Sequence, residues 1–179
     1  LSADKNNSYV LQLLGTLYLQ KKDFKLSEEY LLNSLKYDPE NPGTLNNLGL
    51  LKKNIKDFKT SLEYLELNIK KNNFLNSWVN KSNVLLEDEK FKEGLEFSKE
   101  ALKIFPKHLK IRNNFEFFLF KCGFQNEALN IYRELDIEEL HSVESYLNYC
   151  NLLIQVNNLR LALKIIDKFL LIHKDNLEG

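Results

Sequence analysis

Residues 8–41 read SYVLQLLGTLYLQKKDFKLSEEYLLNSLKYDPEN, and this stretch decides the fold. In its first half Leu11 and Leu14 stand three residues apart, which is the apolar spacing of a helix. In its second half the small residue Ser27 is followed four positions later by Leu31, which predicts a second helix. The stretch therefore predicts two short helices that pair as a hairpin.

The same pattern recurs along the chain, with units that start at Ser8, Pro42, Leu75, Leu109 and Val143 and with spacings of 34, 33, 34 and 34 residues. One helix pair cannot bury its apolar face alone, whereas stacked pairs can. We therefore expect an all-α fold, a right-handed superhelical solenoid of antiparallel helix pairs. It is predicted to be one domain over residues 8–176, after an N-terminal extension of residues 1–7, with units 8–41, 42–74, 75–108, 109–142 and 143–176.

At this point the chain closely resembles the tetratricopeptide repeat family, from residue 8 to about residue 176. The first unit carries the family pattern at Leu11, Leu14, Gly15, Tyr18, Ser27, Leu31, Ser34 and Pro39. The fourth unit departs from it, because Arg112 and Glu116 stand where the pattern has an apolar and a small residue. We expect the first helix of that unit to be shifted or rotated.

Charge and hydropathy exclude several classes of partner. The 25 basic and 25 acidic side chains cancel, so no bulk field draws the protein to nucleic acid or to an anionic membrane. No apolar run approaches the roughly 20 residues of a membrane helix. We predict a soluble, cytoplasmic protein with no nucleic-acid or membrane partner. Since the chain opens on Leu1 and contains no Met, we expect it to be a piece of a longer protein.

Asparagine recurs at one position of the predicted first helices. The sixth position of the units reads Leu13, Asn47, Asn80, Asn114 and Asn148, and Asn83 and Asn151 lie one turn further along. The family resemblance implies that these helices line a concave groove. A carboxamide carries both donors and an acceptor, so such a column could hold the backbone of an extended peptide. The column is similar to the asparagine array in the repeats of O-linked N-acetylglucosamine transferase. Chance is the competing explanation, because Asn makes up 22 of the 179 residues.

Two further residues are candidates for the groove. Lys110 is the one cation recovered when the chain is compared with the carboxylate clamp by which some family members bind acidic C-terminal tails, so that clamp is not predicted. Phe117, or Phe120 in the same aromatic-rich helix, is a candidate for an apolar pocket that receives a partner side chain.

No catalytic, cofactor or metal site is predicted. His108, His141 and His173 fall near unit junctions, and Cys122 and Cys150 form no close pair, so we expect ordinary helix-end histidines and buried thiols. The predicted function is a non-catalytic module that binds an extended peptide or a partner protein. The alternative is a scaffold that self-associates through its repeat ends or is attached to a catalytic domain, such as a glycosyltransferase or sulfotransferase, outside this chain.

Overall fold

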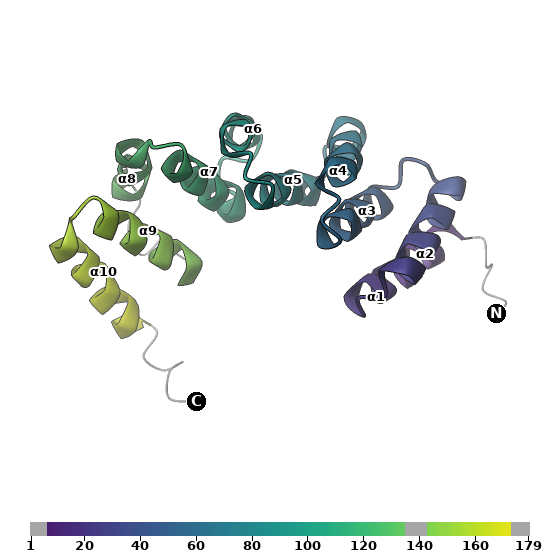
Figure 1. The fold of residues 1–179 in the computed structure, drawn as a ribbon, viewed down its shortest axis with the longest axis horizontal. Helices are drawn as coiled ribbons and strands as arrows, with labels where there is room; N and C mark the ends of the chain where they lie inside the picture. Colours follow the sequence, from purple (N-terminus) through teal and green to yellow (C-terminus); the bar gives the residue numbers. More distant parts are fainter. Residues whose placement is uncertain (1–6, 135–142, 173–179) are drawn as a thin grey trace. The chain divides into compact units, whose positions relative to one another are not determined.

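A computed structural model describes residues 7–134 and 143–172, and helices are the only regular elements in that part of the chain (Figure 1). In order they are α1 (Ser8–Gln20), α2 (Phe24–Tyr37), α3 (Pro42–Asn54), α4 (Phe58–Asn72), α5 (Leu75–Glu87), α6 (Phe91–Ile104), α7 (Leu109–Lys121), α8 (Gln125–Glu134), α9 (Val143–Gln155) and α10 (Leu159–Ile172). The predicted all-α class is confirmed.

The chain divides into two compact units, Leu1–Lys90 with α1 to α5 and Phe91–Gly179 with α6 to α10. A single domain over residues 8–176 remains a prediction.

The turns inside the helix pairs share one backbone conformation. Lys22, Lys56, Glu89, Gly123 and Asn157 have φ values of 60°, 62°, 56°, 87° and 59°, and they occupy the same position of their repeats. A residue in the left-handed region ends each first helix and redirects the chain into the next one. Because Gly123 falls at this position in the fourth repeat, α7 is in register with the other first helices. The expected shift of that helix is therefore wrong.

Polar side chains fix where the early helices begin. Asn7 and Asn41 cap α1 and α3, and Asp23 and Asp57 cap α2 and α4, each accepting a backbone N–H from the first turn of its helix. Such a cap satisfies a donor that the helix itself cannot pair. Pro42, at the first position of α3, has no N–H to satisfy there.

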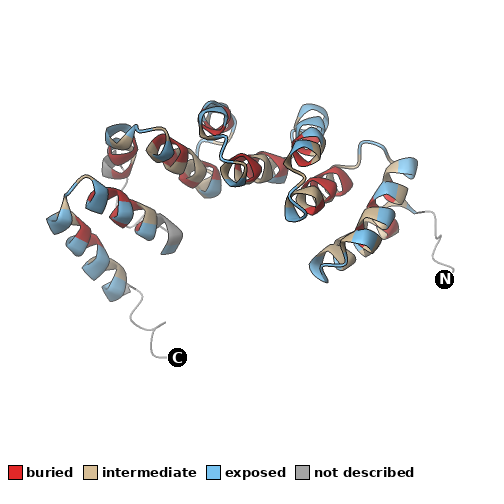
Figure 2. Cartoon of the chain, viewed as in Figure 1, coloured by how far each residue is buried: buried red, intermediate tan, exposed pale blue. Residues whose placement is uncertain are grey.

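Close packing within the helix pairs of the first unit depends on two glycines. A Cβ on Gly15 would lie 2.5 Å from Cγ of Leu31, and one on Gly49 would lie 2.6 Å from Cγ of Leu65. Ser27 reinforces the first contact by donating its hydroxyl to the carbonyl of Gly15 at 2.9 Å. Only glycine lets the leucine of the second helix seat against the first helix at this distance. Figure 2 shows more buried positions in α3 than in α1.

Polar contacts also join successive repeats in this unit. Ser34, near the end of α2, donates its hydroxyl to the carbonyl of Ser8 at 2.9 Å and lies 2.9 Å from the hydroxyl of Thr44 in α3. Asn68 of α4 donates to the hydroxyl of Ser77 in α5 at 2.8 Å. These contacts help to place α1 beside α3 and α3 beside α5. The first helices of the repeats therefore form one layer within the unit.

The second unit is held by aromatic packing. The ring of Phe118 in α7 occupies the space above Gly94 of α6, where an added Cβ would clash with it. Tyr132 of α8 stacks on Tyr149 of α9, with ring centroids 4.5 Å apart. The helices α7 and α9 also contact each other. This arrangement brings side chains of α7, α8 and α9 together.

Candidate functional site

A row of polar side chains crosses the layer of first helices in the first unit. Asn47 of α3 donates its amide to the hydroxyl of Thr16 in α1 at 2.7 Å, and Gln12 donates to the same hydroxyl at 3.1 Å. Asn80 of α5 donates its amide to the carboxamide oxygen of Asn46 in α3 at 2.8 Å. Both Asn47 and Asn80 are half-buried. The column predicted from sequence thus also binds one repeat to the next.

These bonds leave hydrogen-bonding capacity for a ligand. A carboxamide has two N–H donors and one oxygen with two lone pairs, and the contacts to Thr16 and Asn46 use one donor of Asn47 and one of Asn80. The sequence interpretation missed both acceptors. Asn46 is buried and also accepts from Ser77 at 3.4 Å. Its only signal in the sequence was its place beside Asn47, because the contacts that bury it come from the neighbouring helix.

The predicted site residues fall in both units. In the first unit, Asn83 is half-buried on α5, the helix that also carries Asn80. In the second unit Asn114 is half-buried on α7, whereas Lys110 of α7 and Asn151 of α9 are exposed. The structure brings Phe117 and Asn148 together, from α7 and α9, at the wall of one pocket.

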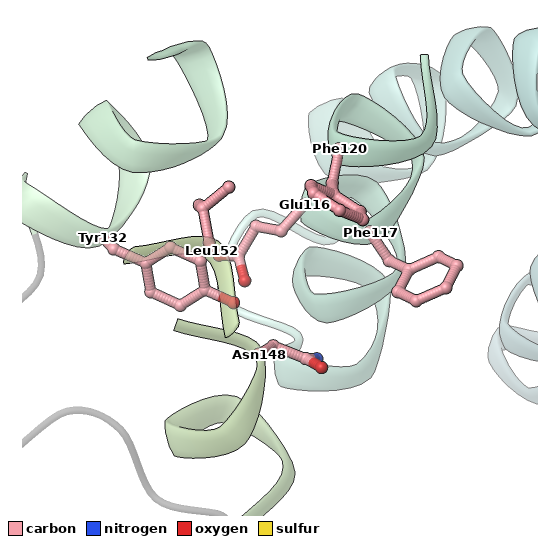
Figure 3. Close-up of a pocket in the computed structure, with 6 residues that line it drawn as sticks. All are labelled: Glu116, Phe117, Phe120, Tyr132, Asn148 and Leu152. Carbon is pink, nitrogen blue, oxygen red and sulfur yellow. The ribbon is translucent and has the colours of Figure 1, made fainter. Parts of the chain in front are cut away.

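That pocket has a volume of about 50 Å³ and is lined by Glu116, Phe117, Phe120, Tyr132, Asn148 and Leu152. Figure 3 shows the carboxyl group of Glu116 directed toward the hydroxyl of Tyr132, with Asn148 on the neighbouring helix. The side chain of Phe117 points away from Tyr132 (Figure 3). The pocket therefore combines an acidic group and an amide with aromatic and aliphatic walls.

Glu116 is the most unusual side chain of the pocket. It is 3% exposed, and neither of its carboxyl oxygens makes a hydrogen bond of good geometry to the described residues. Burial raises the pKa of Glu116 to about 7, although the hydroxyl of Tyr132 and the charge of Arg112 act in the opposite direction. The Nε of Arg112 lies 3.9 Å from Oε1, beyond hydrogen-bond distance. Near neutral pH the carboxyl is therefore divided between its charged and neutral forms.

Comparison of the repeats shows how this polar pocket arises. Glu116 occupies the repeat position of Gly15, and Tyr132 occupies that of Leu31. The first repeat has a close apolar contact between these two positions, whereas the fourth has a carboxyl and a phenol. The sequence shows the departure at Glu116, but the family pattern predicts a shifted or rotated helix there and not a polar pocket. Which residue would face Glu116 depended on the packing of α8.

The chain is similar to known proteins in both sequence and fold. The sequence model of the tetratricopeptide repeat matches residues 8–41. Solved structures of such proteins superpose on nearly the whole chain, among them MamA from Desulfovibrio magneticus RS-1, with 14% identity and a TM-score of 0.76 over 94% of this chain and 96% of that one. The fold is that of a tetratricopeptide repeat protein.

Two other tetratricopeptide repeat structures are similar to the chain. YrrB, described as a protein with an unusual peptide-binding site, is 16% identical with a TM-score of 0.70 over 97% of this chain and 90% of its own. The first such domain of Spaghetti (RPAP3), bound to the HSP90 peptide SRMEEVD, is 16% identical with a TM-score of 0.58 over 64% of this chain and 92% of its own. No curated protein matches the sequence.

The remaining residues considered in the sequence are the histidines and the cysteines. His108 is half-buried just before α7, whereas His141 and His173 lie outside the described residues. Cys122 is half-buried and Cys150 is buried, and both are free thiols. Within residues 7–134 and 143–172, no group of His, Cys, Asp and Glu side chains could hold a metal ion. Nor does any helix in those ranges have the length and hydropathy that crossing a membrane requires.

Proposed function

We propose that this tetratricopeptide repeat protein is a non-catalytic interaction module that binds an extended segment of a partner protein along its first helices. The observation that carries the proposal is the amide row of α1, α3 and α5, in which Asn47 and Asn80 are fixed by bonds to the first helix of the preceding repeat. Fixed side chains lose little conformational freedom when a ligand binds. The proposal is also supported by the fold, since YrrB and the Spaghetti domain are peptide-binding proteins with the same architecture.

Backbone recognition fits the charge of the chain. Basic and acidic residues are equal in number, so long-range steering of a charged partner contributes little. A carboxamide can instead donate to a peptide carbonyl and accept from a peptide N–H. On this proposal Asn47 and Asn80 use their remaining N–H and their oxygen in this way, and the partner is held with little dependence on its side chains.

A peptide-display selection against the protein, followed by titration of an enriched peptide, tests the proposal. We expect the Asn47→Ala, Asn80→Ala double variant to bind that peptide at least about tenfold more weakly, because it loses two hydrogen bonds worth about 1 kcal/mol each. The matched control is Asn54→Ala, an exposed position of α3. Circular dichroism shows whether the double variant remains folded. Equal affinity of the folded double variant and the wild type would contradict the proposal.

A second candidate function is end-to-end self-association. Leu17 of α1 is 46% exposed, although its counterparts in the later repeats, such as Leu51 and Leu152, are buried. Leu163 of α10 is 62% exposed, although its counterpart Leu129 is 4% exposed. Leu51, in the second repeat, packs in a cluster with Leu31 of the first repeat. The apolar end of one copy could therefore complete the other end of a second copy in a head-to-tail contact.

Sedimentation velocity at several protein concentrations tests this candidate. We expect the wild type to associate as concentration rises and Leu163→Lys to sediment as a monomer, because a charge would be buried in the contact. Leu32→Lys serves as the control, since Leu32 is an exposed leucine of α2. A monomeric wild type at all concentrations, or association that Leu163→Lys leaves unchanged, argues against head-to-tail contacts.

A further inference from the structure

We propose that the pocket between α7, α8 and α9 binds the ammonium group of a lysine side chain from the partner protein. This inference rests on the proposed function, because it requires a partner chain that lies along the first helices α7 and α9. Lysine binding in this pocket adds a side-chain preference, whereas the rest of the binding depends on the backbone of the partner.

The hydrogen-bond acceptors in the pocket are suited to a positively charged donor. Glu116 is almost fully buried, and its two oxygens make no hydrogen bond of good geometry to the described residues. Asn148 also lines the pocket, and its carboxamide oxygen is a further potential acceptor. A buried carboxyl in this state is costly unless a ligand completes its hydrogen bonds. An ammonium group has three donors and no acceptor, which matches this set.

The walls of the pocket suit the rest of a lysine side chain. Phe120 and Leu152 are apolar and can pack against its methylene groups. The face of Phe117 already lies 5.3 Å from the ammonium of Lys121, so an aromatic surface beside the pocket interacts with a cation in the same structure.

Two positive charges of the protein lie at the pocket, Lys121 over the ring of Phe117 and Arg112 beside the carboxyl of Glu116. Arg112, one turn before Glu116 on α7, lies 3.9 Å from its Oε1. From the other helices the titratable neighbours are Tyr132 of α8 and, stacked on its ring, Tyr149 of α9. Neither tyrosine carries a positive charge. Arg112 is therefore the group that an incoming ammonium must displace or tolerate, and its removal should strengthen binding.

Binding of a cation is linked to the ionisation of Glu116. With a pKa of about 7, roughly one-tenth of the carboxyl is charged at pH 6 and roughly nine-tenths at pH 8. An ammonium prefers the charged form, so its affinity should rise about tenfold between these pH values. A neutral hydrogen-bonding ligand would show no such increase.

The test uses the whole chain with carboxyl-labelled glutamate, and n-butylammonium chloride as an analogue of the lysine side chain. The NMR signal of Glu116, assigned by its loss in Glu116→Gln, is followed during titration at pH 6 and pH 8, with n-butanol as the neutral comparison. We expect saturable shifts with n-butylammonium that are about tenfold tighter at pH 8, and no comparable increase with n-butanol. Absence of a shift at pH 8, or equal binding at both pH values, would overturn the proposal.

A second variant keeps the test independent of how Glu116→Gln folds. Arg112→Gln should bind n-butylammonium more tightly than the wild type, because the competing charge at 3.9 Å is removed. Weaker binding by folded Arg112→Gln would mean that the pocket does not select a cation. The probe has no peptide backbone, so its binding does not depend on Asn47 and Asn80. Failure of the pocket and failure of the peptide-binding proposal are thus distinguishable.

Discussion

Replacing Glu116 by glutamine should change how the stability of the second unit depends on pH. Burial raises the pKa of this carboxyl from 4.5 to about 7, a difference that corresponds to about 3 kcal/mol at about 1.4 kcal/mol per pKa unit. Because the pKa is higher in the folded state, this contribution is fully present below pH 4.5 and is lost as the pH rises to about 7. Glutamine has a similar shape and stays neutral, so Glu116→Gln does not undergo this loss.

Urea unfolding of the wild type and of Glu116→Gln measures this effect. We expect similar unfolding free energies near pH 4, and at pH 8 an advantage of about 3 kcal/mol for the variant. Amide hydrogen exchange in α7 reports on the second unit. Fluorescence of Trp78, the single tryptophan, reports on the first unit and serves as an internal control. If hydrogen exchange in α7 showed the same dependence of stability on pH for the wild type and for Glu116→Gln, the buried carboxyl would not be the cause.

Two further predictions concern the first unit. Gly49→Ala should destabilise it by about 1–3 kcal/mol, because the new Cβ would lie 2.6 Å from Cγ of Leu65. Urea unfolding monitored by Trp78 fluorescence measures this change. Unchanged stability would show that α4 can move away at little cost. Asn41→Ala should cost about 1 kcal/mol in the same assay, because its Oδ1 accepts the backbone N–H of Thr44 at 2.9 Å, whereas Asn54→Ala, at an exposed position, should have little effect.

The repeat architecture could be predicted because its determinants are local. Leu-Gly pairs at a constant spacing, with a small residue in the second helix, indicate a close helix contact, and the structure places Gly15 and Gly49 in that role. The turn positions are equally local. Gly123 occupies the left-handed position of the fourth turn and keeps α7 in register, even though Glu116 departs from the family pattern. One departure inside a helix does not change its register when the turn that follows it is kept.

The contacts of the site could be predicted only in part. The spacing of Asn47 and Asn80 shows that they share a helix position, but not that Thr16 and Asn46 accept their amides, because those contacts depend on the distance between neighbouring repeats. The environment of Glu116 could not be predicted from the sequence either. Burial by three helices sets its pKa, and no local pattern encodes that burial.

Binding of partners along the first helices of the repeats can be measured residue by residue. Amide chemical-shift mapping with a display-selected peptide does this, because each backbone N–H reports on its own position. We expect the peptide to shift signals of α1, α3 and α5 around Asn47 and Asn80, and to leave α2 and α4 largely unchanged. Shifts confined to α2 and α4, with α3 and α5 unaffected, would contradict it.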